Sequence, residues 1–330
     1  HRVPNEQERN NHLLSISSRI RWDKDRLNKI IQALSQSGTF VADDIGMRFQ
    51  DNRQEQSFNA YICQQIARLK RLGKIRTSET YTAAFRSFNG FMNDKEVLFN
   101  QISADLIAEY EAYLKGRGNS PNTISFYMRV LKAVYNRAVE DGLTGQRHPF
   151  KSVYTGVEKT LKRAISLNDL KRIKGLDLSL KPNLDFARDM FLFCFYTRGM
   201  SFIDMAYLRK KDLQNGILSY RRRKTGQQLF IKWERCMQEI VDKYPINETE
   251  YLLPIITKRN KDYRKQYTNE LHRVNHLLKK IGKQLDLSIP LTMYVGRHSW
   301  ASIAKSRNVP ISVISEGMGH DSENTTQIYL

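Results

Sequence analysis

The last fourteen residues of the chain, from Gly317 to Leu330, contain a histidine and a tyrosine nine residues apart, His320 and Tyr329. Ser322, between them, suits the N-cap position of a short helix, which would place Tyr329 near the far end of that helix. A tyrosine hydroxyl is a candidate nucleophile when its proton is removed or its anion is stabilised. The segment therefore predicts covalent chemistry at Tyr329, directed toward whatever the protein binds.

The same segment resembles the C-terminal box of the tyrosine recombinases, in which the pattern G-H-x-S-x-x-T-T-x-x-Y carries a histidine and the tyrosine that attacks DNA. The resemblance implies that Tyr329 forms a 3′-phosphotyrosine and that His320 belongs to the same site. The covalent link conserves the energy of the phosphodiester, so neither a nucleotide cofactor nor a metal ion is expected. Arginine suits the phosphoryl oxygens, and lysine or histidine can protonate the departing 5′ oxygen.

A second box, Tyr294-Val295-Gly296-Arg297-His298, lies upstream, with Arg297 32 residues before Tyr329. It resembles the H-x-x-R box of the family, which implies that Arg297 binds the phosphate. Tyr294 stands where that pattern has its first histidine. A tyrosine can hydrogen-bond a phosphate oxygen but is a poorer proton shuttle at neutral pH, so the identity of the general base stays open. His298 is interpreted as a buried, hydrogen-bonded histidine, with direct participation in the chemistry or DNA contact as the alternatives.

The stretch from Ser219 to Gly226 matches the place where the family carries a mobile catalytic lysine on a β-hairpin, which implies this role for Lys224. Strand alternation predicts that Arg222 and Lys224 share one face. The alternative is a basic hairpin on which Arg222 and Arg223 only clamp the phosphate backbone.

The first arginine box of the family, T-G-L-R-x-S-E/D, is altered here, because Ser201 stands at the place of the arginine. Arg198 precedes it by three residues. If the helix already includes residue 198, the two positions share a face, and the guanidinium could reach the same phosphate across one helical turn. We therefore predict that Arg198 is a displaced first arginine. The alternatives are a site with one arginine fewer and a phosphate contact supplied by Arg222 or Arg223 on the hairpin. Asp204 keeps the acidic position and is expected to orient its neighbours.

The composition favours a polyanionic partner. Lys and Arg exceed Asp and Glu by 54 − 34 = 20, and 40% of the residues are hydrophobic, as in a folded protein. The three cysteines are isolated and suggest neither a disulfide framework nor a zinc site. No segment reads as a signal peptide or a membrane span, so a soluble, intracellular protein is expected.

The elements that position these residues fall into four predicted regions. Residues 1–56 read as an amphipathic helix, from Glu8 to about Ser35, and a connector; the resemblance implies the remnant of an arm-binding domain. Residues 57–143 read as a helical DNA-binding domain with four serine- or proline-initiated helices: 57–72, 78–92, 103–115 and 121–141.

Residues 144–165 read as a basic linker lying along DNA. Residues 166–330 read as a catalytic domain with helices at 184–196 and about 201–207, strands at 217–220 and 228–233, and further helices beyond Asn269. On the fourth helix of the second region, Arg129, Lys132 and Arg137 mostly lack acidic partners and are expected to contact phosphates.

The resemblance implies a mainly α fold with a small antiparallel β-sheet, in which a helical core-binding domain and a mixed α/β catalytic domain close as a C-shaped clamp on duplex DNA. It further implies site-specific recombination by a bacterial mobile-element integrase or a DNA invertase, in the cytoplasm and associated with the nucleoid. The implied assembly is a homotetramer on paired DNA sites, formed from monomers, with DNA-bending accessory proteins. Two alternatives remain: a catalytically impaired architectural DNA-binding protein and a type IB topoisomerase-like enzyme.

Overall fold

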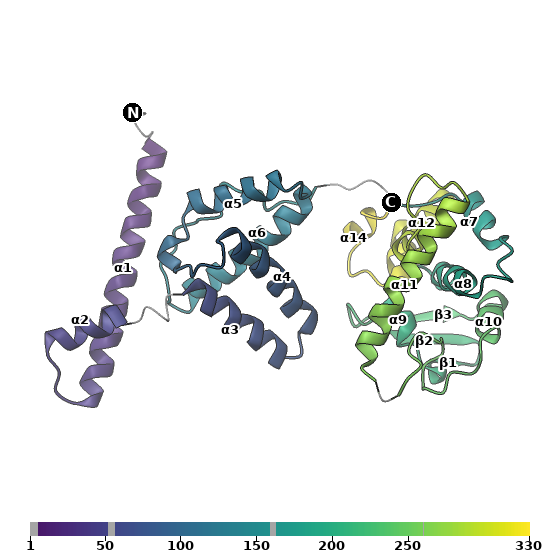
Figure 1. Ribbon diagram of the computed structural model, residues 1–330, viewed down its shortest axis with the longest axis horizontal. Helices are drawn as coiled ribbons and strands as arrows, with labels where there is room; N and C mark the ends of the chain where they lie inside the picture. The colour runs from purple at the N-terminus through teal and green to yellow at the C-terminus, as the bar shows by residue number, and fades with distance from the viewer. Residues whose placement is uncertain (1–5, 52–56, 159–162, 260) are drawn as a thin grey trace. The chain divides into compact units, whose positions relative to one another are not determined.

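The computed structural model describes residues 6–51, 57–158, 163–259 and 261–330 (Figure 1). Contacts within the chain divide it into two compact units, His1–Lys159 and Thr160–Leu330. The division falls inside the stretch predicted to be a linker. Among the described residues, no helix combines the length and the apolar character that crossing a membrane requires.

The first unit contains six α-helices among its described residues: α1 (Glu6–Ser37), α2 (Ala42–Asp51), α3 (Phe58–Arg71), α4 (Ile75–Phe91), α5 (Ala104–Gly116) and α6 (Pro121–Glu140). The predicted amphipathic helix is confirmed as α1. The connector prediction is wrong at α2. There the Asp44 carboxylate accepts a hydrogen bond from the Val41 backbone N–H at 2.9 Å, and acidic residues in the first turn favour the helix dipole.

Serine caps set the starts of three of these helices, as predicted. The hydroxyls of Ser57, Ser103 and Ser120 each accept a hydrogen bond from a backbone N–H in the first turn. The fourth, α4, begins three residues earlier than predicted, because the Ser78 hydroxyl donates to the Ile75 carbonyl at 2.7 Å instead of capping.

The stretch after α6 belongs to the first unit as far as residue 158, which differs from the predicted linker. Phe150 and Val153 are buried in the same core as Phe88 and Tyr110. The Ser125 hydroxyl on α6 donates to the Gly156 carbonyl. Isolated apolar residues that fit a preformed core leave no periodic pattern, so the sequence did not reveal this packing.

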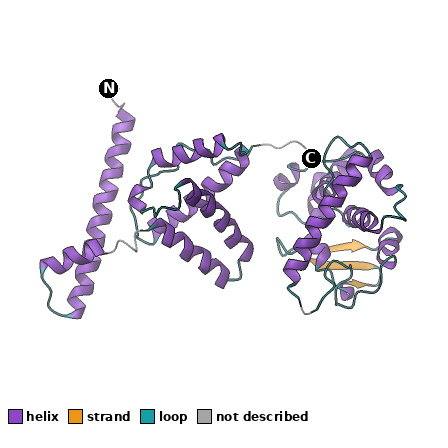
Figure 2. Cartoon of the chain, in the orientation of Figure 1, coloured by secondary structure: helices purple, strands orange, loops and turns teal. Residues whose placement is uncertain are grey.

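The second unit combines helices with one small sheet (Figure 2). Its elements are α7 (Leu167–Lys174), α8 (Pro182–Tyr196), α9 (Phe202–Ala206), β1 (Leu213–Gln214), β2 (Ile217–Arg221), β3 (Gln228–Lys232), α10 (Arg235–Asp242), α11 (Tyr263–Gln284), α12 (Met293–Ser306), α13 (Ile311–Met318) and α14 (Glu323–Gln327). The sheet has the order β1-β2-β3 and is antiparallel, with Leu218 opposite Ile231 and Tyr220 opposite Leu229 on its buried face. The prediction of a mainly α fold with a small antiparallel sheet is confirmed.

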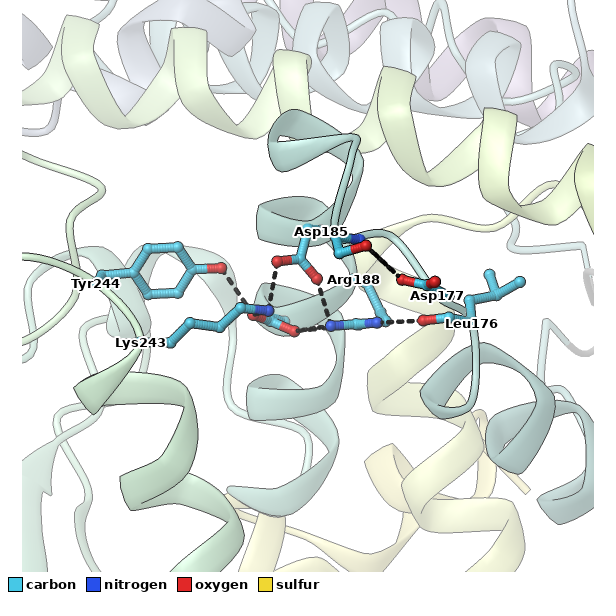
Figure 3. A network of polar contacts seen from close by, with 8 residues as sticks. Leu176, Asp177, Asp185, Arg188, Lys243 and Tyr244 are labelled. Atoms are coloured by element: carbon cyan, nitrogen blue, oxygen red, sulfur yellow. Dashed lines mark hydrogen bonds and ion pairs between the residues drawn. The ribbon is translucent and has the colours of Figure 1, made fainter.

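Helix α8 is the element around which this unit packs, and a buried polar network fixes α10 to it (Figure 3). Asp189 on α8, 3% exposed, accepts hydrogen bonds from Lys243 at 2.8 Å and from Tyr244 at 2.7 Å, just after α10. Arg188 binds the same carboxylate and the Leu176 carbonyl. Against another side of α8, Gly296 of α12 lies so close that a Cβ atom would meet the Phe191 ring at 3.2 Å. Helix α12, which carries Arg297, is therefore held on a rigid support.

Candidate active site

Two buried arginines of the second unit, Arg222 and Arg297, form the centre of the candidate site. Arg297 on α12 and Arg222 in the loop after β2 are each 6% exposed. Arg297 donates hydrogen bonds to the carbonyls of Gly199 and, at 2.8 Å, Met318, and Arg222 donates to the carbonyl of Gly319. The Nε atom of each guanidinium is buried and has no hydrogen-bond partner among the residues that the structure describes.

No carboxylate of the described residues forms an ion pair with either arginine. Burial and the nearby charge of Arg297 lower the pKa of Arg222, although Asp204 partly compensates. Two buried like charges are costly unless a negative group neutralises them. The pair is therefore suited to an anion, and guanidinium donors match the oxygens of a phosphate.

Two glycines make this close packing possible. Gly199 has φ +73°, and a Cβ atom there would lie 3.0 Å from the Arg297 Cα. Gly319 has φ +65°, and its Cβ would lie 3.0 Å from the Arg222 Cδ. Both positions require the left-handed backbone that glycine adopts without strain, and both lack room for a side chain.

Tyr329 lies beside this arginine pair. It follows α14 by two residues, in a turn where its N–H donates to the Thr326 carbonyl at 2.9 Å, so it is just beyond the helix end. Ser322 occupies the predicted N-cap position of α14, but its hydroxyl faces the Thr325 hydroxyl instead of a backbone N–H. The guanidinium carbon of Arg297 is 5.5 Å from the centre of the Tyr329 ring.

The pKa of Tyr329 results from opposed effects. Burial raises it, but a hydrogen bond with Tyr294 and the positive charges of Arg297 and Lys224 lower it below the ordinary value of a tyrosine. The environment thus stabilises the phenolate, which is the nucleophilic form.

His320 is held by two hydrogen bonds. Its Nε2 lies 2.9 Å from the Nη2 of Arg297, and its Nδ1 lies 2.8 Å from the Thr326 hydroxyl. Because a guanidinium only donates, Nε2 accepts and the ring proton resides on Nδ1. Burial and the charges of Arg297 and Arg222 lower the pKa of His320 to about 4, so the ring is neutral at pH 7.

His298 is also buried, as predicted, and burial lowers its pKa to about 4. Neither of its ring nitrogens has a hydrogen-bond partner among the described residues, so the prediction of a hydrogen-bonded histidine is wrong. Its ring lies 4.4 Å from that of Tyr329 and 4.4 Å from that of Tyr294, measured between ring centres. Only 5% of the residue is exposed, which leaves little surface for the DNA contact considered as an alternative.

Lys224 is exposed in the turn between β2 and β3. Hydrogen bonds from Gly226 N–H to the Arg222 carbonyl and from Arg222 N–H to the Gln227 carbonyl, both 2.8 Å, close this loop. The predicted alternation of Arg222 and Lys224 on one strand face is wrong, because β2 ends at Arg221 and the two side chains differ in burial. The charge of Lys224 nevertheless acts on both Tyr329 and His320.

The prediction that Arg198 replaces the missing first arginine depends on residue 198 being helical, and the structure contradicts this. Residue 198 has φ +58° and lies between α8 and α9, so it is not helical. Its side chain lies by Gly317 and makes a long hydrogen bond of 3.5 Å to the Phe230 carbonyl. The Ser201 hydroxyl caps α9 and donates to Asp204 at 2.6 Å.

Arg223 points elsewhere than Arg222. Its guanidinium lies 4.0 Å above the Tyr207 ring, while its backbone N–H donates to Asp204 at 2.9 Å. Asp204 thus ties α9 to the hairpin loop, in keeping with an orienting role. In the first unit, Arg129, Lys132 and Arg137 are exposed on α6.

The structure brings together Arg297, His320, Tyr329, Tyr294 and His298, with Lys224 within electrostatic range. From the sequence, Arg222 is expected to clamp the phosphate backbone and is only a second choice, after Arg198, for the missing first arginine. Its burial continues the inward alternation of Leu218 and Tyr220 by one step beyond the strand, which is the signal that could have revealed it. Thr326, which orients His320, carried no distinguishing signal beyond its place in the final box.

Comparison with known protein families assigns both units. Residues 57–155 match the model of the phage integrase SAM-like domain, and residues 180–330 match that of the phage integrase family. The tyrosine recombinase XerA of Thermococcus kodakarensis is 25% identical over 233 residues, covering 69% of this chain and 77% of that protein. The tyrosine recombinase XerD of Listeria innocua is 21% identical over 270 residues, covering 77% and 86%.

Solved structures share the fold. A lambda integrase dimer bound to a COC′ core site aligns with a TM-score of 0.66 at 15% identity, covering 91% of this chain and 84% of that one. The Tn1549 transposon integrase in complex with transposon right end DNA gives a TM-score of 0.58 at 16% identity, covering 82% and 94%. A lambda integrase tetramer bound to a Holliday junction gives 0.63 at 14% identity, covering 83% and 77%.

Proposed function

The chain belongs to the phage integrase family of tyrosine recombinases, and we propose that Arg222, Arg297, Lys224, His320 and Tyr329 form its catalytic centre. As a member of this family it is an enzyme of site-specific recombination, which cleaves and rejoins DNA. The two alternative functions, a catalytically impaired architectural DNA-binding protein and a type IB topoisomerase-like enzyme, are not favoured. The observation that carries the proposed centre is the buried Arg222–Arg297 pair next to Tyr329, and neither arginine forms an ion pair with a carboxylate in the described part of the chain.

In the proposed reaction, the scissile phosphate binds between the two guanidiniums. The Tyr329 oxygen attacks phosphorus, the bond from phosphorus to the 5′ oxygen breaks, and that oxygen takes a proton from Lys224. The tyrosine proton leaves to the phosphate or to water, because histidines with a pKa of about 4 are weak bases at neutral pH. Religation reverses each step: a 5′ hydroxyl attacks, Tyr329 leaves, and Lys224 regains its proton.

Arg222 takes the role that we assigned from the sequence to Arg198. The absence of an arginine at Ser201 leaves one side of the phosphate without a donor, and Arg222 enters from the hairpin with an unpaired Nε. Removal of such a donor costs a factor of about 10² to 10³ in comparable sites.

We also propose the DNA partner of the protein, its location and its oligomeric state. The protein acts on double-stranded DNA in the bacterial cytoplasm, at the nucleoid, as a homotetramer on two paired sites, and DNA-bending accessory proteins assist. The lambda integrase complexes, a dimer on a core site and a tetramer on a Holliday junction, support this assembly by analogy. Exposed basic residues on α6 contact DNA phosphates. Arg129→Ala should therefore make the slope of log K against log salt concentration less steep by the contribution of about one phosphate contact.

The test is covalent capture from genomic DNA of the source organism. The protein is incubated with that DNA and denatured, and fragments still attached to protein are sequenced. We expect fragments whose 3′ ends fall at one defined sequence. Inverted copies of that sequence would indicate an invertase, and a junction with a mobile element would indicate an integrase. A yield no higher than that of Tyr329→Phe would contradict the function.

A further inference from the structure

Tyr294 lies beside the proposed nucleophile, Tyr329. It lies in the first turn of α12, three residues before Arg297 and thus on the same face of the helix. The centres of the Tyr294 and Tyr329 rings are 6.0 Å apart, with the planes inclined by 57°, and the two hydroxyls are close enough for each to shift the pKa of the other.

The rings of Tyr294 and Tyr329 both pack against the ring of His298. The His298 ring stands nearly perpendicular to Tyr294, at 78°, and lies at 33° to Tyr329. The Ser302 hydroxyl fixes the backbone at the other end, donating to the Tyr329 carbonyl at 3.1 Å. Tyr294 itself is 47% exposed. Its hydroxyl is therefore positioned by packing on one side while remaining accessible to a DNA phosphate on the other.

The surrounding charges favour ionisation of Tyr329 over ionisation of Tyr294. Arg297 from α12, Lys224 and Arg222 from the hairpin, and Arg163 before α7 supply positive charge, and His298 and His320 are the neutral titratable groups beside the pair. Burial and the neighbouring Tyr329 raise the pKa of Tyr294 to about 12, whereas that of Tyr329 is lowered. Once Tyr329 is ionised its oxygen carries no proton, so in that state Tyr294 is the donor and the Tyr329 oxygen the acceptor.

We propose that Tyr294 is a positioning residue that donates a hydrogen bond to the Tyr329 oxygen and stabilises the phenolate before attack. This inference rests on the proposed role of Tyr329 as nucleophile and adds a partner for it. It also gives a function to the residue that replaces the histidine of the family's H-x-x-R box.

The role requires no proton transfer from Tyr294. As the bond from the Tyr329 oxygen to phosphorus forms, negative charge moves to the phosphoryl oxygens and the Tyr294 hydrogen bond weakens. In religation the bond to phosphorus breaks, and Tyr294 again donates to the departing phenolate oxygen. The same hydroxyl therefore assists cleavage and rejoining.

The experiment compares Tyr294→Phe, Tyr294→His and the parent in single-turnover cleavage of a nicked DNA substrate between pH 6 and 10. Tyr294→Phe keeps the ring but loses the donor. A hydrogen bond to a charged group corresponds to a factor of about 10 to 100, so cleavage at pH 7 should slow by about that factor. The defect should shrink as the pH rises, because the phenolate then forms without help. DNA affinity should change by less than about twofold.

Tyr294→His should recover part of the lost rate, because an imidazole N–H can also donate. Tyr244→Phe is the matched control: it loses a hydroxyl that donates to Asp189, outside the site, and should lower the melting temperature while leaving the pH profile unchanged. Melting temperatures of the Tyr294 variants show whether any loss comes from unfolding.

A parental rate and pH profile for Tyr294→Phe would overturn the inference, as would a defect of equal size at every pH. Either result would leave the proposed function intact as long as Tyr329→Phe forms no covalent adduct. A normal adduct from Tyr329→Phe would instead remove the proposed function itself. If Tyr294→Phe does not fold, the test uses Tyr294→His and Tyr294→Ala instead. A folded Tyr294→His that cleaves no faster than Tyr294→Ala would also overturn the inference.

Discussion

Arg222 and Arg297 donate hydrogen bonds to consecutive carbonyl groups, those of Gly319 and Met318, in the turn that precedes His320. The two guanidiniums come from a hairpin loop and from α12, about 75 residues apart in the sequence, and they converge on one segment. That segment leads through α14 to Tyr329. The turn therefore positions the proposed phosphate-binding groups and the proposed nucleophile relative to each other.

The first prediction concerns which arginine replaces the one missing at Ser201. Arg222→Ala should lower the cleavage rate on a nicked substrate by about 10² to 10³, because it removes a buried donor from the phosphate site. Arg198→Ala should have a much smaller effect, since that side chain is directed at the Phe230 carbonyl. The reverse order of the two defects, at equal DNA affinity, would restore Arg198 as the displaced first arginine.

Gly319→Ala tests the close approach of the turn to Arg222. The substitution costs about 1 kcal/mol for a side chain at positive φ and also places a methyl group against the Arg222 Cδ, which must move. Cleavage should fall by more than the loss of stability explains. Gly216→Ala is the control, because Gly216 has φ +71° with nothing within 4 Å of its Cβ position. Equal cleavage by both variants at matched stability would argue against a positioning role for the turn.

Acid should destabilise the second unit through its buried histidines. His298 has a folded-state pKa of about 4 and an ordinary value near 6.5, so the unfolded chain binds the proton first. Its contribution is fully present above pH 6.5 and is lost as the pH falls toward 4, by up to about 3 kcal/mol. His298→Phe should therefore flatten the dependence of the melting temperature on pH between 7 and 4. An unchanged slope would show that His298 is not buried in neutral form.

Local sequence signals and long-range packing contributed differently to what could be predicted. Ser57, Ser103 and Ser120 cap their helices through bonds within one turn, so their positions could be read from the sequence. Helix α10 was missed, because its end is anchored by Lys243 and Tyr244 to Asp189, more than fifty residues away.

The same distinction applies to the site. Arg297 and Tyr329 stand in patterns of fixed spacing. The conformation of Arg198 depends on how α8 ends, with Gly199 pressed against Arg297, and no local pattern specified that turn. The burial of Arg222 likewise depends on Gly319, 97 residues later in the chain. Tyr294 and Tyr329 belong to two segments whose proximity only the fold determines.

The central claim is that Tyr329 becomes covalently attached to DNA. The direct measurement is a nicked substrate carrying the captured site, incubated with the protein, digested with protease and analysed by mass spectrometry for the peptide that carries a nucleotide 3′-phosphate. We predict that the modified peptide contains Tyr329 and that Tyr329→Phe binds the same DNA with unchanged affinity but yields no adduct. An adduct on Tyr294 or any other residue of the parent protein, or a normal yield from Tyr329→Phe, would contradict the account.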